Sequence, residues 1–126
     1  MPIELDHLIL RVNDAGETAA FYERVLGFTS EGQAGPFTVL RVTPTLTLQL
    51  APWGSEGGEH LAFAMTPAEF DAALERVRCA GIAYGDSFHA VGNMQGPGEE
   101  LGAKGLGKAL YFLDPSKHLI EIRCYA

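Results

Sequence analysis

Residues 4–8 (ELDHL) and residues 21–28 (FYERVLGF) decide the fold of this chain, because the same pattern occurs a second time. The second copy begins at residues 58–61 (GEHL) and continues at residues 73–77 (ALERV). In each copy a short apolar segment with a histidine precedes a segment of helical spacing that ends near a glycine. The repeat predicts two equivalent modules within one chain.

The two copies also end alike, and the alignment pairs side chains of types that bind metals. LTLQL closes the first copy and HLIEI closes the second. His7 therefore corresponds to His60, and Gln49 corresponds to Glu121. A duplication of this kind suggests four side chains around one pseudo-twofold axis, so the repeat bears on function as well as on fold.

The length and composition indicate one globular domain. The chain has 126 residues, 47 % of them hydrophobic, which is enough to bury a core and argues against disorder. We expect a single domain over residues 1–126, with module one at about 3–51 and module two at about 59–126. No apolar run approaches the roughly 20 residues that cross a bilayer, and the first residues lack the regions of a signal peptide. A cytoplasmic location is expected.

The net charge of −7 bears on the class of partner. Nucleic acids and anionic membranes are bound by clustered Lys and Arg, and the sequence has no such cluster. We expect a small-molecule partner. The excess of carboxylates does not exclude an anionic one. Cys79 and Cys124 form no disulfide framework and are expected to be small buried side chains.

Module one reads as a strand, a helix and three further strands. Residues 3–12 alternate so that His7 and Arg11 share one face and apolar side chains take the other. Asp14 begins a helix with a capping-box pattern, and Gly27 ends it. The three strands are expected near residues 28–31, 36–43 and 45–51.

Module two has the same βαβββ order. Residues 59–65 read as a strand with His60 on one face, and Thr66 followed by Pro67 is a strong helix start. Gly81 ends this helix, and strands are expected near residues 83–88, 108–113 and 118–124. The glycine-rich residues 89–107 are expected to form a long loop, either a functional lid that is mobile without ligand or a tolerated surface insertion.

Four segments make the chain resemble the vicinal oxygen chelate superfamily, which comprises glyoxalases, bleomycin-resistance proteins and extradiol dioxygenases. They are LDHL at 5–8, AFYERVLGF at 20–28, EHLAF at 59–63 and YFLDPSKHLIE at 111–121. The last is similar to the family's Tyr-Phe-x-Asp-Pro-x-Gly-x-x-x-Glu element, except that Lys117 replaces the usual Gly. The resemblance implies an α+β fold: two tandem βαβββ modules forming an open, cup-like mixed β-sheet with helices outside.

The resemblance also implies a metal centre on the inner wall of the cup. His7, His60 and Glu121 would bind one divalent ion, and Gln49 would be a further ligand or would bond to water. Imidazole nitrogen and carboxylate oxygen suit Zn²⁺, Mn²⁺, Ni²⁺, Co²⁺ or Fe²⁺. Two histidines and one carboxylate leave positions open for two adjacent substrate oxygens, on which the ion acts as a Lewis acid.

Residue 49 separates the subfamilies. Glyoxalase I has Glu there, and an amide cannot replace one carboxylate of its proton shuttle, whereas His/Gln/His/Glu resembles methylmalonyl-CoA epimerase. The turn at residues 114–117 is unlike the epimerase's. Extradiol dioxygenases and fosfomycin thiol transferases have a Tyr ten residues before the Glu, as Tyr111 stands before Glu121. Dioxygenases also use second-sphere histidines, and His89 is the one spare loop histidine of the sequence.

The candidate catalytic residues are Glu121 and Tyr111, and Tyr111 is also a candidate for substrate binding or for packing alone. Arg11 and Arg123 share the inward parity of the metal candidates. Either arginine orients a substrate anion or forms a salt bridge to Glu4 or Glu59. Trp53 follows a strand end and lines the mouth of the cup or covers the core.

These observations predict a divalent-metal-dependent enzyme that acts on a small molecule with vicinal oxygens by non-redox lyase, isomerase or transferase chemistry. An Fe²⁺ extradiol dioxygenase is the first alternative, and a metal-free, bleomycin-resistance-like binding protein is the second. We expect a homodimer, and both a cup within one chain and a cup shared by two chains are compatible with the sequence.

Overall fold

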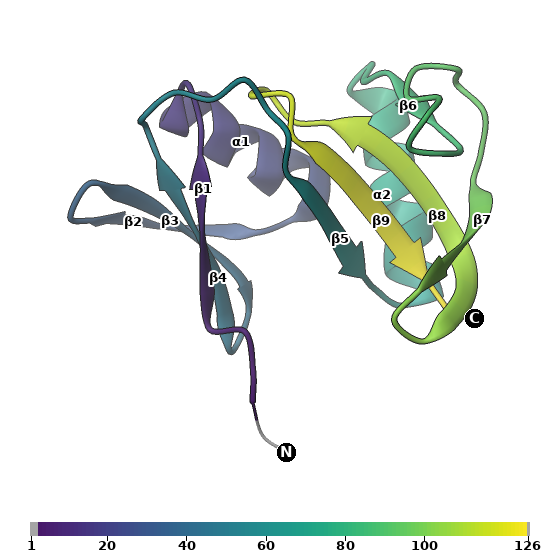
Figure 1. The fold of residues 1–126 in the computed structure, drawn as a ribbon, viewed down its shortest axis with the longest axis horizontal. Helices are drawn as coiled ribbons and strands as arrows, with labels where there is room; N and C mark the ends of the chain where they lie inside the picture. Colours follow the sequence, from purple (N-terminus) through teal and green to yellow (C-terminus); the bar gives the residue numbers. More distant parts are fainter. Residues whose placement is uncertain (1–2, 126) are drawn as a thin grey trace. The chain divides into compact units, whose positions relative to one another are not determined.

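The structure is a computed structural model that describes residues 3–125, within which the chain forms two helices and nine strands. The chain divides between Glu56 and Gly57 into two compact units, and each is described by itself. Both units contain one helix and an open mixed sheet, which confirms the predicted α+β class (Figure 1). No helix within residues 3–125 is long and apolar enough to span a membrane.

The first unit contains one helix and four strands. They are β1 (His7–Arg11), α1 (Ala15–Leu26), β2 (Thr29–Ala34), β3 (Phe37–Thr43) and β4 (Leu46–Ala51). The strand order is β1-β4-β3-β2, with β1 parallel to β4 and the other pairs antiparallel. The Asp14 carboxylate accepts from Glu17 N at 2.9 Å, and Gly27 ends α1 with φ of +74°, so both predicted caps are confirmed.

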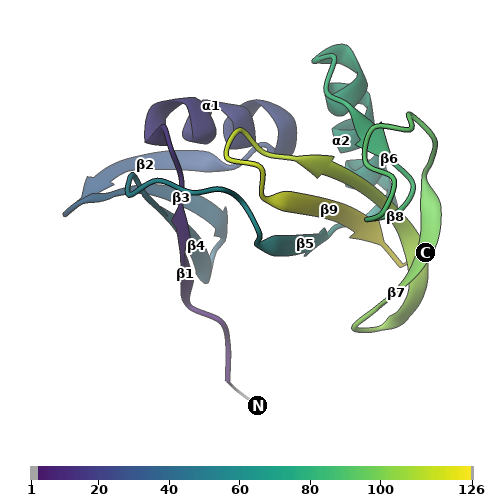
Figure 2. The ribbon, with the colours of Figure 1, turned by 45° about the horizontal axis from the view of Figure 1, so that its top comes forward.

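The core of the first unit lies between α1 and its sheet, as Figure 2 shows. Tyr22 and Val25 of α1 are fully buried, as are Leu40 and Leu50 of the sheet. The other face of β1 is open, because His7 and Arg11 are exposed while Leu10 between them is buried. The predicted alternation along this strand is confirmed, and it leaves the histidine on the face away from the core.

The second unit has one helix and five strands. They are β5 (His60–Ala64), α2 (Pro67–Cys79), β6 (Tyr84–Gly85), β7 (Gly98–Gly102), β8 (Gly105–Leu113) and β9 (Leu119–Cys124). The strand order is β5-β9-β8-β6, and β7 pairs with β8 as a hairpin. Thr66 caps α2 by accepting from Glu69 N at 3.2 Å, as predicted.

Strand register confirms the duplication residue by residue. In the first unit Gln49 is the Cα partner of Ile9, two residues after His7. In the second unit Glu121 is the Cα partner of Ala62, two residues after His60. The opposite neighbours also correspond, because Val39 pairs with Gln49 and Tyr111 pairs with Glu121.

Three expectations about the second unit were wrong. Residues 98–102 form a strand and β8 begins at Gly105, so only part of the 89–107 segment is irregular. Strand β6 has two residues instead of the expected six, because Ser87 to Gly92 turns back on itself through bonds such as Ala90 N to Ser87 O at 3.1 Å. Both cysteines are free, but only Cys124 is buried, and Cys79 is exposed at the end of α2.

The turn before β9 contains the departure from the family motif. The buried Asp114 carboxylate accepts from Ser116 N at 2.8 Å and from His118 N at 3.0 Å. Lys117 adopts φ of +69°, a left-handed conformation that a glycine takes without steric cost. His118 is buried and its Nδ1 accepts from Glu59 N at 3.3 Å, so this histidine joins the turn to the segment before β5.

Candidate metal and substrate site

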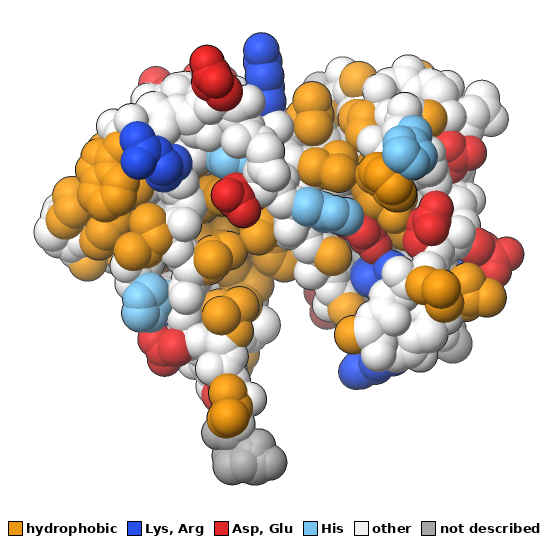
Figure 3. Space-filling view, viewed as in Figure 1, with side chains coloured by type: hydrophobic (Ala, Val, Ile, Leu, Met, Phe, Trp, Pro, Cys, Tyr) orange, Lys and Arg blue, Asp and Glu red, His pale blue; other side chains and the backbone are white. Residues whose placement is uncertain are grey.

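The neighbouring strands β5 and β9 place a histidine and a carboxylate together. His60 lies on the same face as Ala62, and Ala62 is the register partner of Glu121. His60 Nε2 is 3.0 Å from Glu121 Oε1. The Glu121 side chain is 6 % exposed and that of His60 is 45 % exposed, so the pair is buried on one side and open to solvent on the other. Histidine and acidic side chains interrupt apolar surface around β5 and β8 in the space-filling view (Figure 3).

Arg123 holds the second oxygen of Glu121. Its Nη1 donates to Glu121 Oε2 at 2.6 Å, and the arginine side chain is itself buried. Burial is the largest single effect and opposes the charge of the guanidinium, but the hydrogen bond to Glu121 together with the interactions with Tyr125 and the Glu121 charge raises the pKa of Arg123. The glutamate therefore has one oxygen bound to a fixed cation and the other directed to His60. Arg123 therefore forms a salt bridge, but with Glu121 rather than with the expected Glu4 or Glu59.

Tyr111 of β8 lies beside Glu121 of β9. The two residues are register partners, and the Tyr111 and His60 ring centroids are 6.2 Å apart. Burial, followed by the negative charges of Glu121 and Glu100, raises the pKa of Tyr111 to about 12. The phenol is therefore protonated at neutral pH, where it is a hydrogen-bond donor or a general acid rather than a base.

The first unit carries the matching pair at the equivalent register. His7 Nδ1 is 2.7 Å from the Asp6 carboxylate. The other ring nitrogen, Nε2, is the one that this proposal would assign to a metal ion. A histidine held by a carboxylate through one nitrogen is the usual arrangement of a metal ligand, because the carboxylate fixes the ring orientation. Gln49 is half-buried between the aliphatic side chains of Ile9 and Val39 in register. Its surroundings are less polar than those of Glu121.

Arg11 and Trp53 form one cluster in the first unit. Arg11 Nη2 donates to Trp53 O at 2.9 Å and Arg11 Nε donates to Gly54 O at 3.1 Å. The guanidinium carbon lies 5.8 Å from the Trp53 ring centroid. The centroids of the Phe37 and Trp53 rings are 5.6 Å apart, and the two rings are tilted relative to each other. Trp53 is 50 % exposed, so part of its aromatic ring faces solvent. The hydrogen bonds from Arg11 hold the backbone of residues 53 and 54 in place. The substrate-binding roles of Arg11, Arg123, Tyr111 and Trp53 stay predictions.

The donor types of the candidate side chains suit a divalent cation, and the structure brings two of them, His60 and Glu121, together. Within residues 3–125 no group of three or more His, Cys, Asp or Glu side chains gathers closely enough to hold an ion. The four candidates are divided between the units, with His7 and Gln49 in the first and His60 and Glu121 in the second. The His60–Glu121 pair supplies nitrogen and oxygen donors that already converge, and Glu121 has the second hydrogen-bonding partner that metal-binding carboxylates usually have.

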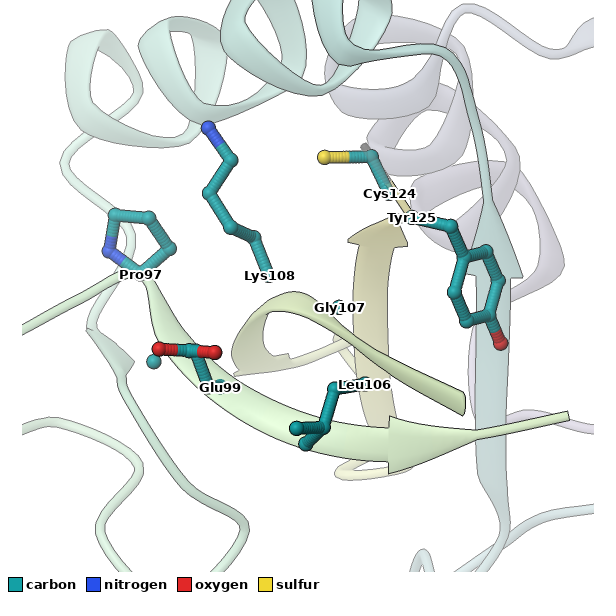
Figure 4. A pocket seen from close by; sticks show the side chains of 8 residues that line it. Pro97, Glu99, Leu106, Gly107, Lys108, Cys124 and Tyr125 are labelled. Carbon is teal, nitrogen blue, oxygen red and sulfur yellow. The ribbon is translucent and has the colours of Figure 1, made fainter. Parts of the chain in front are cut away.

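A cavity of about 380 Å³ in the second unit lies on the other face of the β8–β9 pair. Its lining includes Glu99, Lys108 and Cys124, and Lys108 and Cys124 are register partners (Figure 4). Lys108 Nζ lies 5.6 Å from the Phe70 ring of α2, so this side chain extends toward the helix. Because side chains alternate along a strand, Cys124 and Glu121 point to opposite faces, and the cavity is separate from the metal candidates.

Sequence reasoning missed the groups that surround Arg123. Arg123 Nη2 donates to Glu100 O at 2.9 Å and to Gly105 O at 3.4 Å, and Tyr125 lies beneath the guanidinium with its ring centroid at 4.7 Å. The glycines of residues 98–107 were the available signal, but they were interpreted as a sign of mobility. A backbone that approaches a buried side chain closely also needs glycine, because a β-carbon would collide with that side chain.

Comparison with known proteins agrees with the duplicated fold. The model of the Glyoxalase/Bleomycin resistance protein/Dioxygenase superfamily matches residues 4–122. The virulence protein STM3117 of Salmonella typhimurium is 30 % identical over 130 residues, which cover 96 % of this chain and 83 % of that protein.

Solved structures are similar over nearly the whole chain. Oxidase ChaP-H2 has a TM-score of 0.82 and 26 % identity, with 100 % of this chain and 96 % of that chain covered. A mutant of the fosfomycin resistance protein FosX from Listeria monocytogenes, in complex with Mn(II) and 1S,2S-dihydroxypropylphosphonic acid, has a TM-score of 0.70. That likeness, at 23 % identity over 98 % of this chain and 90 % of the other, is one of fold.

Proposed function

Because the chain belongs to the glyoxalase/bleomycin resistance/dioxygenase superfamily, we propose that it is a divalent-metal-dependent enzyme. Its substrate is a small molecule with two adjacent oxygens, and its chemistry is that of a non-redox lyase, isomerase or transferase. The observation that carries the proposal is the contact of 3.0 Å between His60 and Glu121. The matching register of His7 and Gln49 in the first unit supports the same ligand set.

The metal-binding residues in this proposal are His7, His60 and Glu121, with Gln49 as the fourth candidate. A bound divalent ion would supply Lewis acidity to the substrate oxygens. Arg123 keeps Glu121 turned so that Oε1 lies beside His60. The half-exposed His60 leaves the solvent side of the pair open, and a substrate would approach from there.

Proton transfer is assigned to Glu121 and Tyr111. The Gln49 amide cannot accept a proton at neutral pH, so a two-carboxylate shuttle is not available. Tyr111, whose pKa is raised to about 12, would donate a hydrogen bond or a proton to a substrate oxygen that gains charge. Glu121, the register partner of Tyr111, would move a proton on the same side.

Two further observations support this choice. The FosX structure holds Mn(II) and a molecule with two adjacent hydroxyls in the same fold. In the second unit, the ring of His89 lies against that of its chain neighbour Phe88, with centroids 3.8 Å apart and the planes tilted by 42°, so the spare loop histidine is engaged in a local contact.

Metal binding is tested by stripping the purified chain and titrating it with Mn²⁺ in a calorimeter. We expect about one ion per cup, and His60→Ala and Glu121→Ala should each reduce affinity severely because they remove a ligand. His89→Ala is the matched control and should bind as the natural chain does. Undiminished binding by either ligand variant would overturn the assignment, and no binding by the natural chain would favour a metal-free binding protein.

Fe²⁺ extradiol dioxygenase chemistry is the second candidate, favoured by the 26 % identity to an oxidase. Anaerobic reconstitution with Fe²⁺, followed by a panel of catechols under air, separates the two. Oxygen uptake with a yellow ring-cleavage product would support the second candidate. Turnover of a vicinal-oxygen substrate with Mn²⁺, Ni²⁺ or Zn²⁺ and no oxygen use would support the first.

A further inference from the structure

One buried side chain joins the β7–β8 hairpin to the metal candidates. Arg123 Nη1 donates to Glu121 Oε2 at 2.6 Å. The other terminal nitrogen, Nη2, donates to Glu100 O on β7 at 2.9 Å and to Gly105 O on β8 at 3.4 Å. The guanidinium is a rigid planar group. A displacement of the hairpin carbonyls would therefore also displace the nitrogen that binds the carboxylate.

The hairpin is shaped to lie directly against this guanidinium. A β-carbon added at Gly102 would lie 2.6 Å from Arg123 Nε and would also collide with Tyr125 Oη. A β-carbon at Gly107 would collide first with the Cys124 backbone oxygen and would lie 3.1 Å from Arg123 Nη2. Gly102 therefore provides space for the arginine, and Gly107 provides space for the β9 backbone and the arginine. Lys104 N also donates to Tyr125 Oη at 3.3 Å, which adds a second tie between the hairpin and the end of β9.

The geometry restricts where Glu121 can point. Its side chain is 6 % exposed and that of Arg123 is 4 % exposed, so the ion pair lies away from solvent. A buried carboxylate that lost this partner would lose a charged hydrogen bond, which is costly to leave unmade. The hairpin carbonyls and the Glu121 carboxylate therefore contact the same buried guanidinium.

We propose that Arg123 is a positioning residue that couples docking of the β7–β8 hairpin to the orientation of Glu121 and thereby sets the affinity for the metal ion. The inference rests on the proposed function, since it takes Glu121 as a ligand. It adds that residues 98–107 of the hairpin, which are not among the proposed ligands, control the metal site. Loss of such an outer partner typically weakens metal binding about 10- to 100-fold.

The test uses the full chain and three variants, Arg123→Met, Arg123→Lys and Gly102→Ala. Mn²⁺ affinity is measured by calorimetry, and amide hydrogen exchange of residues 98–107 is measured without metal. Arg123→Met should weaken Mn²⁺ binding about 10- to 100-fold and speed hairpin exchange. Arg123→Lys should recover part of the affinity, since an ammonium still pairs with Glu121, but not the slow exchange, because it lacks the fork. Gly102→Ala, whose β-carbon would meet the Arg123 guanidinium and the Tyr125 hydroxyl, should weaken binding and speed exchange together.

Leu101→Ala is the matched control. Leu101 is 76 % exposed on the same strand, so its truncation changes β7 without displacing the hairpin from the guanidinium. Mn²⁺ affinity unchanged in Arg123→Met and Gly102→Ala, or weakened equally by Leu101→Ala, would overturn the coupling. Failure of the natural chain to bind Mn²⁺ would instead overturn the proposed function, while faster hairpin exchange in Arg123→Met would still show that the arginine holds the hairpin.

Discussion

At the scale of single residues, the side chains around Glu121 have distinct ionisation behaviour. Tyr111 is the clearest, because burial and the charge of Glu121 raise its pKa to about 12. In the metal-free protein, between pH about 10 and 12, the unfolded chain loses the phenol proton while the folded chain keeps it. Unfolding then releases a proton, so this contribution to stability is present below pH about 10 and is lost as the pH rises toward 12.

We expect the difference in unfolding free energy between the natural chain and Tyr111→Phe to shift against the natural chain as the pH rises through that window. Denaturant unfolding at several alkaline pH values measures the difference, and tyrosinate absorbance follows the ionisation of the four tyrosines directly. If Tyr111→Phe leaves the highest tyrosinate step in place, the assignment of that step to Tyr111 is wrong.

Lys117 is the second residue with a specific consequence. It adopts φ of +69° at the position where the family motif has Gly. Lys117→Gly should therefore raise the free energy of unfolding by about 1 kcal/mol or less, since relief of the left-handed conformation exceeds the entropy that glycine adds to the unfolded chain. Urea unfolding is the measurement. Lys104→Gly, at a residue without positive φ, is the control and should give no gain.

At the scale of elements, the helix starts follow from short-range sequence. Thr66 accepts from Glu69 N at 3.2 Å and Pro67 occupies the first turn, so α2 is defined by four consecutive residues. Thr66→Ala should lower the free energy of unfolding by about 1 kcal/mol, because one N–H of the first turn loses its acceptor. Thr66→Ser keeps an acceptor oxygen and should lie close to the natural chain in urea unfolding. Equal losses in both variants would contradict a capping role.

At the scale of the whole molecule, edge strands point to association. The first sheet ends at β1 and β2, and β5 is an edge of the second. Such strands carry backbone groups that need covering, and β1 also bears Ile9 with 45 % exposure. We expect a homodimer of twice 13.6 kDa in light scattering at micromolar concentration. A mass of 13.6 kDa throughout that range would refute it.

A dimer permits a test of where the ligand set is completed. Chains carrying His7→Ala and chains carrying Glu121→Ala are unfolded together and refolded as mixed dimers. If first and second units of different chains share one site, one of the two symmetry-related sites in each mixed dimer is intact. Random mixing of equal amounts makes about half of the dimers mixed, so about a quarter of all sites are restored. If each chain completes its own site, Mn²⁺ binding stays as low as in the separate variants.

The sequence by itself determined the features that depend on local chemistry and on repetition. Capping residues, glycine stops and alternation depend on neighbours within a few residues, so α1, α2 and the face of His7 could be predicted. The duplication aligned His60 with His7 and Glu121 with Gln49 before any register was known, and the strand pairing reproduces that alignment.

Only the tertiary structure decided the surroundings of Glu121. The backbone partners of Arg123, Glu100 O and Gly105 O, lie 23 and 18 residues away along the chain, and such contacts depend on how β7 and β8 fold back on β9. Glycine at residues 102 and 107 is compatible with a mobile loop as well as with close packing, and composition does not distinguish the two. The physical reason is that a glycine's role is set by the atoms that would meet its missing side chain, and strand pairing brings those atoms there.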